Sequence, residues 1–393
     1  MEKKGERMNE KIRELLNENK QYLLKVRRHL HQNPELSEHE FETQKYIINF
    51  LEKYNVEYTI LAKTGIYAKI KNGQGKSLAF RADMDALPLI ENNNLEFKSK
   101  NEGIMHACGH DVHMAVQLTL LKILAENKDL WKGSAHFFFQ PAEETVGGAK
   151  RMLEEGIDTE KIDNILSFHC APEIEVGKIG IKYDKLHATS MVFKFRILGK
   201  ATHGALAYTG IDSVVIGSKV VDFLQTIVSR RIDARDCAVI TVGTFNAGTA
   251  ENIVAGEAEL TGTVRTLTQE MKKYILNIFK TDLVKFVEAY GAKIEINIRD
   301  SYAPVINNKE FTDYLLKNAK DILGEDKIEY IQIPRMDVED IGFFLEKIPG
   351  TFYRLGVSKN NFTQLHTTNF YVDEEALNVG LKVQLKIALE YLC

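Results

Sequence analysis

The stretch Met105-His106-Ala107-Cys108-Gly109-His110-Asp111-Val112-His113 gathers three histidines, one cysteine and one aspartate in a few residues. A thiolate and an imidazole two residues apart, Cys108 and His110, can reach one divalent ion when the backbone between them turns or extends. Gly109 permits the left-handed or tight backbone that this convergence needs. Apolar residues at helical spacing follow over 112–124 and predict a helix packed behind the motif. The stretch predicts a metal site at a helix start; the alternative is a buried cysteine with scattered histidines.

Several other acidic and histidine side chains follow short apolar runs that predict strands. The run Ser134 to Phe139 leads into Glu143 and Glu144, and the run Asn164 to Phe168 leads into His169 and Cys170. Open α/β sheets place their chemistry just past the carboxyl ends of strands. Two adjacent carboxylates there can serve different tasks, one as metal ligand and one as general base. In chain order, the candidate residues are Asp83, Cys108, His110, Glu143, Glu144, His169 and His366.

The bulk composition restricts the class of protein. A chain of 393 residues is long for one core, so we expect two domains. A net charge of −4 and a pI near 6.3 argue against nucleic acid or an anionic membrane as the main partner. The beginning has no apolar core of signal-peptide length, and no later window reaches the roughly 18 apolar residues of a membrane span. The four cysteines are too widely spaced to suggest a disulfide framework. We therefore expect a cytoplasmic protein of the size of an enzyme.

The pattern of predicted helices and strands changes near residue 185 and again near 300. Between these points, two βαβ-like units in series predict an α+β module with helices on one face of an antiparallel sheet. We predict an α/β catalytic domain in two parts, 1–185 and 301–393, whose mixed sheet carries helices on both faces. The module at 186–300 is then inserted into it, and the stretch after it predicts helices near 308–323, 337–347 and 373–391.

The segment before the first predicted strand carries a second helix signal. Ser37 followed by Glu40 is a capping-box pattern, which predicts a helix from there toward Tyr54. The neighbouring histidines His29, His31 and His39 are interpreted mostly as surface or capping residues; the alternative for His31 is a place near the site.

At this point the residues resemble a known family, the metallopeptidases that include aminoacylases, carboxypeptidase G and hippurate hydrolase. The similarity extends from about His31 to Leu377 and is greatest to the amidohydrolase branch, with hippurate hydrolases, plant auxin-conjugate hydrolases and bacterial N-acyl-amino-acid deacetylases. The motifs that carry it are RRHLHQNPELSEHE, FRADMDALPL, MHACGHDVHMA, FFFQPAEE, GGAKRML, TVGTFNAGTAENIVAGEAELTGTVRTL and LHTTNF.

The resemblance implies roles for individual residues. Glu143 would be the general base, and Asp83 would orient a ligand. The inserted module would be a ferredoxin-like dimerisation or lid domain of a homodimer, with His203 reaching into the partner subunit's site. Asn252 and Arg265 would bind substrate. Two divalent metal ions per subunit, manganese or zinc and alternatively cobalt or nickel, would be held by Cys108, His110, Glu144, His169 and His366.

The implied activity is hydrolysis of the amide bond of an N-acyl-amino acid by a metal-activated water. The substrate would be a small molecule, an N-acyl-amino acid or a short peptide. Alternatives within the class are a carboxypeptidase or dipeptidase and an N-acetyl-diaminopimelate deacetylase. Outside it, the chain would be a metal-stabilised binding module without catalysis, although such a module needs no base beside its ligand.

Three departures from the family pattern concern the surroundings of the site. Arg81 stands where many relatives outside this branch have a histidine ligand. Leu206-Ala207-Tyr208 replaces the usual Pro-His pair, and the segment 337–341 replaces a commoner Ser-Glu-Asp-Phe. The last two affect the expected shape of the substrate pocket more than the metal chemistry.

Overall fold

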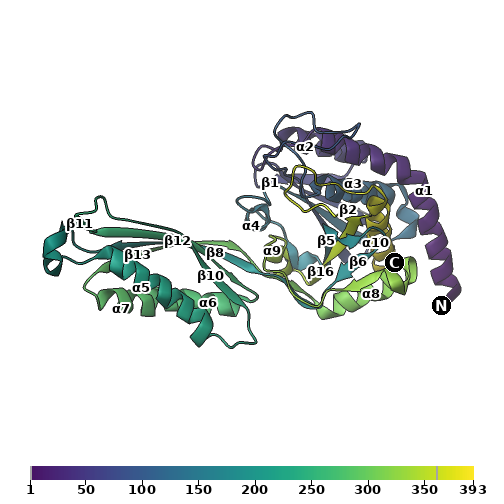
Figure 1. The fold of residues 1–393 in the computed structure, drawn as a ribbon. Helices are drawn as coiled ribbons and strands as arrows, with labels where there is room; N and C mark the ends of the chain where they lie inside the picture. The colour runs from purple at the N-terminus through teal and green to yellow at the C-terminus, as the bar shows by residue number, and fades with distance from the viewer. Residues whose placement is uncertain (1, 360–361) are drawn as a thin grey trace. The chain divides into compact units, whose positions relative to one another are not determined.

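The computed structural model describes residues 2–359 and 362–393, which divide into two units (Figure 1). Unit 1 comprises Met1–Asp184, Ile306–Ile333 and Asp340–Cys393, and unit 2 comprises Lys185–Val305 and Pro334–Glu339. The short second segment of unit 2 differs from our prediction, which placed it in 301–393. It packs with unit 2 because the Arg335 amide donates to the Leu186 carbonyl and the Ala188 amide donates to the Asp337 carbonyl.

Unit 1 is built on an eight-stranded mixed sheet. Its central strands β3, β4, β5 and β16 run parallel and are almost entirely buried, as expected for strands covered on both faces. We predicted that the β5 strand ends near Phe168, but β5 continues further because β16 pairs with it on its far side. In sheet order, the strands are β1 (Glu57–Leu61), β2 (Gly65–Asn72), β4 (Gly133–Gln140), β3 (Ser77–Asp83), β5 (Asn164–Glu175), β16 (Gly350–Ser358), β6 (Ile179–Ile181) and β15 (Ile328–Tyr330).

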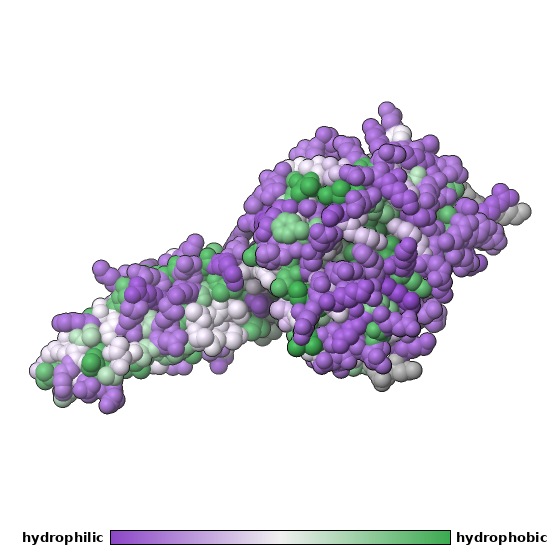
Figure 2. Space-filling view, turned by 90° about the horizontal axis from the view of Figure 1, so that it is seen from above, coloured by the Kyte–Doolittle hydropathy of each residue, from purple (hydrophilic) through white to green (hydrophobic). Residues whose placement is uncertain are grey.

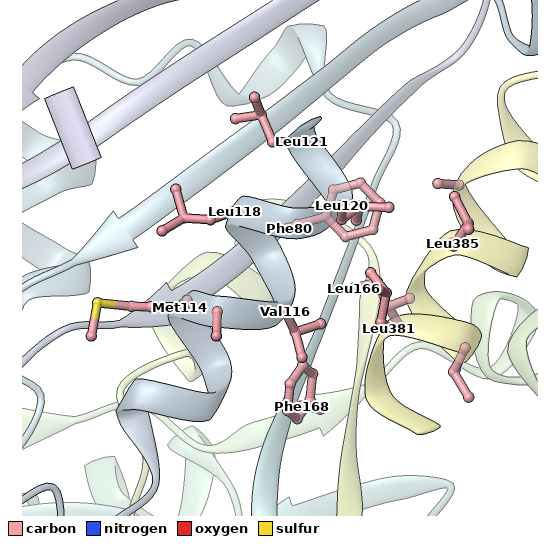
Figure 3. Close-up of a cluster of buried hydrophobic side chains, with 14 of the residues drawn as sticks. Phe80, Met114, Val116, Leu118, Leu120, Leu121, Leu166, Phe168, Leu381 and Leu385 are labelled. Carbon is pink, nitrogen blue, oxygen red and sulfur yellow. The ribbon is translucent and has the colours of Figure 1, made fainter. Parts of the chain in front are cut away.

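Helices cover both faces of this sheet, as predicted. On one face, side chains of β3, β5, α3 (His110–Glu126) and α10 (Glu375–Tyr391) form a dense apolar core, part of which is shown in Figure 3. Each fully buried large apolar side chain there contributes roughly 1.5–3 kcal/mol. Successive residues of a strand face opposite ways, so Phe138 lies on the other face, where it stacks on Phe344 of α9 (Gly342–Leu345) with ring centroids 4.7 Å apart.

The remaining helices of unit 1 are α1 (Glu2–Gln32), α2 (Phe41–Lys53), α4 (Gly148–Glu154) and α8 (Lys309–Leu323). The α1 helix packs on α3 and α10. The predicted helix over 337–347 is reduced to the short α9, because its first residues belong to unit 2. Among the described residues, no helix is long and apolar enough to cross a membrane.

The capping box predicted for α2 is wrong. The helix does begin after Glu40, but the Glu40 side chain makes no cap. Instead, the Glu35 carboxylate accepts the amide hydrogens of Glu42 and Thr43. The Ser37 hydroxyl donates to Asp85, 2.6 Å away.

Unit 2 has the predicted α+β architecture. Its antiparallel sheet has the strand order β10 (Ala238–Ala247), β12 (Glu257–Thr266), β8 (Thr189–Leu198) and β13 (Lys293–Tyr302), which is ferredoxin-like. The helices α5 (Ser213–Thr226), α6 (Gln269–Ile278) and α7 (Val284–Glu288) cover one face around a core that includes Phe193, Phe195 and Phe279. Charged side chains alternate with these along the strands and occupy the open face, for example Lys194 and Arg196. Figure 2 shows apolar and neutral patches among the hydrophilic ones on the visible surface of this unit.

Candidate metal and catalytic site

The carboxyl ends of three parallel strands of unit 1 bring most of the predicted residues to one edge of the sheet. Asp83 is the last residue of β3 and pairs with Gln140, the last residue of β4. Glu143 and Glu144 follow on the next loop. His169 lies on β5, beyond the last pair that β5 forms with β3. The topology therefore places side chains from distant parts of the sequence around one point.

Cys108 lies at the centre of the donor atoms. Its Sγ is 3.2 Å from Nε2 of His169 and 3.3 Å from Nε2 of His366. The same nitrogen of His366 is 3.3 Å from Oε1 of Glu144. Sulfur and nitrogen ligands at about 2.3 and 2.1 Å from one zinc ion lie about 3.1–3.6 Å apart. These separations fit donors that share an ion.

Hydrogen bonds to the outer ring nitrogens orient two of the histidines. Nδ1 of His110 is 2.8 Å from the Asp85 carbonyl oxygen, and Nδ1 of His169 is 2.7 Å from the Cys170 carbonyl oxygen. A carbonyl only accepts, so both Nδ1 atoms carry the hydrogen and both Nε2 atoms are left with a lone pair for a metal. Within the described residues, neither Nε2 of His110 nor Oε1 of Glu144 has a hydrogen-bond partner, although both are buried.

The local charges also suit cations. Burial alone would lower the pKa of His110, but Asp83, Asp85 and Glu144 raise it to about 10. Burial and the neighbouring Glu144 raise the pKa of the Cys108 thiol well above its usual range. Carboxylates contribute to both shifts, and for His110 they outweigh burial, so the site carries negative charge that protons or metal cations can neutralise.

The donor atoms form two overlapping sets. Cys108, His110 and His169 are one set, and Cys108, Glu144 and His366 are the other; within each set all donor atoms lie within 4.8 Å of one another. Two sets that share a thiolate fit a pair of divalent ions, which would be held by the five predicted ligands. The buried donors without partners and the surplus negative charge agree with this fit.

Glu143 lies beside the donors. It is 7% exposed, and its carboxylate lies within 4.8 Å of the donor atoms of His110 and Glu144. A carboxylate in this place can exchange a proton with a molecule bound among the donors.

His113 is a residue of the site that sequence reasoning missed. Its Nε2 accepts the amide hydrogen of Cys170 at 3.0 Å, so the ring hydrogen is on Nδ1, which donates to Asp83 at 2.5 Å. Both ring nitrogens are therefore used, and His113 orients Asp83 rather than binding metal. The signal was present, because His113 lies three residues after His110 on one face of the same helix.

Asp83 is held by the Arg81 guanidinium and lies beside His110. One oxygen accepts from the Arg81 guanidinium at 2.7 Å and lies 3.4 Å from Nε2 of His110. Burial opposes ionisation, but Arg81 and His110 hold the pKa of Asp83 well below its usual range. Arg81 also donates to Gln140 and to Asp340, each at 2.8 Å. The residue that replaces a histidine ligand of other relatives is thus a buried anchor in this chain.

His31 is not a surface residue, contrary to our interpretation. It is 3% exposed and contacts Asp111 at 2.8 Å and Glu91 at 3.1 Å. Asp111 follows His110 directly, so these contacts of His31 hold the residue next to a predicted metal ligand.

The three predicted residues of unit 2 lie in two places. His203, on β9 (Thr202–His203), is exposed, and the amide of the next residue donates to the Asn252 carbonyl at 2.7 Å. Arg265 lies near the other end of β12, where it donates to Ser190 at 2.8 Å. Strands rise about 3.3 Å per residue, so Glu257, at the His203 end of β12, is about 26 Å from Arg265. One copy of unit 2 does not bring His203 and Arg265 together.

The chain is similar to peptidases and deacetylases of known sequence. The pattern of peptidase family M20/M25/M40 matches residues 79–390. The N-acetyldiaminopimelate deacetylase of Lactobacillus helveticus is 36% identical over 369 residues, 91% of this chain and 94% of that protein. Thermostable carboxypeptidase 1 of Saccharolobus solfataricus is 34% identical over 391 residues, 97% of this chain and 98% of that protein.

A solved structure extends the likeness to three dimensions. The YXEP protein of Bacillus subtilis, described as a dinuclear metal-binding peptidase of the M20 family, has a TM-score of 0.81 and 33% identity. The match covers 95% of this chain and 98% of that one.

Proposed function

Because this chain belongs to peptidase family M20/M25/M40 and is a metal-dependent amidohydrolase, we propose that its substrates are N-acyl-amino acids with a free carboxylate. The reaction would be of the deacetylase or hippurate-hydrolase type. The observation that supports this most is the adjacent pair of carboxylates, with Glu144 among the metal donors and Glu143 beside them.

The metal ions and the side chains of the protein would have different tasks in the reaction. Two divalent ions held by the five donors would polarise the amide carbonyl and lower the pKa of a water molecule. Glu143 takes the proton from the attacking water and returns it to the leaving amine. His203 of a second subunit donates a hydrogen bond to the oxyanion, an interaction worth about 10²–10³ in rate. Asn252 lies next to His203 and would bind substrate beside it.

Arg265 would bind the substrate carboxylate. A guanidinium can meet a carboxylate with two parallel hydrogen bonds, which favours arginine over lysine for this task. Because Arg265 and His203 lie at opposite ends of unit 2, a substrate that contacts both needs a different subunit for each.

The edges of the unit 2 sheet support a homodimer. The edge strand β13 carries Lys293, Glu295 and Arg299, and charged residues protect an edge from pairing. The opposite edge, β10, has no charged residue and exposes Val239 to 44%. The neighbouring α5 helix exposes Val214 to 44%. We propose that the β10 edge and the exposed side of α5 are covered by a second copy of the chain.

Mixed cysteine, histidine and carboxylate ligands are compatible with zinc or manganese, and also with cobalt or nickel. We propose manganese or zinc as the native pair. A cytoplasmic location remains a prediction from the sequence, and cell fractionation would test it.

A substrate panel tests the activity. Protein stripped of metal and reloaded with single metals would be assayed on N-acetyl- and N-benzoyl-amino acids, N-acetyl-diaminopimelate and short peptides. Faster turnover of the acyl-amino acids than of peptides is the expected result. Preference for peptides would favour the carboxypeptidase alternative, which the likeness to the thermostable carboxypeptidase also supports. Selective cleavage of the diaminopimelate substrate would identify a deacetylase like that of Lactobacillus helveticus.

A further inference from the structure

The loop between β4 and α4 carries both Glu143 and Glu144, and buried carboxylates hold its backbone. The Ala142 amide donates to Oε1 of Glu40 at 2.9 Å, and the Glu144 amide donates to Oδ2 of Asp85 at 2.9 Å. The amides on either side of Glu143 are therefore both fixed by hydrogen bonds to buried carboxyl groups.

Ala142 has a strained backbone. Its φ is 54°, in the left-handed region that L-residues other than glycine avoid. The Gly147 amide donates to the Ala142 carbonyl at 2.9 Å and closes the loop. If Ala142 returned to an extended or right-handed conformation, the chain direction after it would change, and the carboxylates of Glu143 and Glu144 would move together.

Glu40 is well placed to prevent this change. It is fully buried, and its second oxygen accepts the Thr64 hydroxyl at 2.7 Å. The residue after Thr64 packs on the same loop: a Cβ on Gly65 would lie 2.6 Å from Cδ of Pro141. The Glu40 and Thr64–Gly65 segments together form a cradle for the start of the loop. A strained backbone persists only where the contacts around it exclude other conformations. The contacts of this cradle have that effect on Ala142.

Neither metal binding nor helix capping accounts for Glu40. It belongs to neither of the two donor sets that contain the predicted ligands, and its side chain makes no cap hydrogen bond on α2. Glu35, in the same segment, makes that cap with its own carboxylate. Glu35 is therefore a matched control, because its side chain also accepts backbone amides but none from the loop that carries Glu143.

We propose that Glu40 is a positioning residue for hydrolysis, which holds Ala142 in its left-handed conformation and so aims Glu143 and Glu144 at the metal site. This inference rests on the proposed roles of those two glutamates. Glu40 touches no reacting atom in this scheme and acts only through the loop.

The test compares Glu40→Ala, Glu40→Gln and Glu35→Ala in the metal-loaded protein. A displacement of about 1 Å in a reacting group can cost about 100-fold, so Glu40→Ala should lower kcat by about 10- to 100-fold. KM should change little, and elemental analysis at saturating metal should still find two ions. Glu40→Gln keeps an oxygen for the Ala142 amide and should recover most of kcat. Glu35→Ala should reduce thermal stability while kcat stays near wild type.

Hydrogen exchange gives a readout that needs no substrate. In Glu40→Ala, amide exchange should accelerate in the peptide that covers residues 141–147, whereas Glu35→Ala should leave that peptide protected. If Glu40→Ala does not fold, Thr64→Val, which removes the other partner of Glu40, should show the same effects to a smaller degree.

Two results would overturn the inference. One is unchanged exchange over 141–147 in a folded Glu40 variant, and the other is an equal loss of kcat in Glu40→Ala and Glu35→Ala. If the wild type instead cleaves another amide, the proposed substrate is wrong, but the same variants can be compared on the substrate that it does cleave. The exchange result then still decides the role of Glu40.

Discussion

Single residues decide the chemistry of this protein. Cys108 is the residue that belongs to both donor sets. Its sulfur lies within 3.3 Å of ring nitrogens from two separate elements. A thiolate is a soft ligand that binds zinc and related ions strongly, so its loss should weaken the binding of both ions.

We expect Cys108→Ala to lower the metal content, measured by elemental analysis of the purified protein. Chelation should abolish the activity of the wild type, and adding manganese, zinc, cobalt or nickel should restore it. A Cys108→Ala protein with full metal content and full rate would remove this residue from the site.

The two adjacent glutamates should separate into a base and a ligand. Glu143→Gln is expected to keep both metals and to lose most of its turnover, because an amide cannot accept the proton of water. Glu144→Gln is expected to lose metal occupancy. Metal analysis alongside kcat distinguishes the two, and the opposite pattern would exchange their roles.

Arg265→Ala should lower kcat/KM strongly for substrates with a free carboxylate. Amide or ester analogues of the same substrates should be barely affected, since they offer no carboxylate for the guanidinium. A uniform loss on both kinds of substrate would mean instead that Arg265 is structural, through its bond to Ser190.

The sequence singled out the candidate metal donors, which the fold brings together, because their residue types are chemically distinctive and follow apolar runs. It did not predict Asp85, His113 or Asp340 as partners of the site. Each of these is recognisable only by what it contacts: Asp340, for example, meets Arg81 from a position 259 residues further along the chain. An aspartate before a short helix has no local signal for such a partner.

At the scale of elements, the start of α3 depends on one glycine. Gly109 has a φ of 88°, and a Cβ on it would lie 2.7 Å from Sγ of Cys170. The left-handed backbone that the motif suggested is present, and the close approach to Cys170 is a further constraint that the sequence did not indicate. The helix start and the metal donors on either side of it are therefore positioned together.

Gly109→Ala should destabilise the fold by about 2–5 kcal/mol, the sum of a left-handed backbone cost and an overpacking cost. Gly103→Ala is the control, because Gly103 has a φ of 79° but nothing within 4 Å of the added Cβ. Denaturant unfolding should show a loss of only about 1–2 kcal/mol for the control. Equal losses in the two variants would show that the contact with Cys170 is relieved at no cost.

Helices and strands were predicted more reliably than their ends. The α10 helix follows its apolar spacing, and β4 follows its apolar run. The errors occurred where distant partners compete with local signals: β5 is extended by β16, and the capping-box pattern at Ser37 and Glu40 is used for contacts to other segments. Local sequence patterns carry no information on such partners.

At the scale of the whole molecule, the proposed homodimer makes a direct prediction. Inactive His203→Ala and inactive Glu143→Ala proteins should complement each other when mixed under conditions of subunit exchange. In a mixed dimer, one site keeps Glu143 and receives a wild-type His203 from the other subunit. Activity should approach that of one working site per mixed dimer.

Each variant mixed with itself is the control and should stay inactive. Proven exchange without recovery would place His203 in the site of its own subunit. A His203→Ala protein that is nearly fully active on its own would make His203 a turn residue with no role in catalysis.

Because Pro334–Glu339 belongs to unit 2, this unit cannot be cut out of the protein or exchanged as one continuous segment. The backbone bonds of Pro334–Glu339 to Leu186 and Ala188 belong to unit 2 but are supplied from far along the chain. A gene fragment that encodes only residues 185–305 therefore lacks part of the unit that it appears to encode. Transplanting unit 2 between homologues as one uninterrupted cassette would pair that cassette with a foreign copy of this segment, so successful chimaeras should be those that exchange both pieces at once.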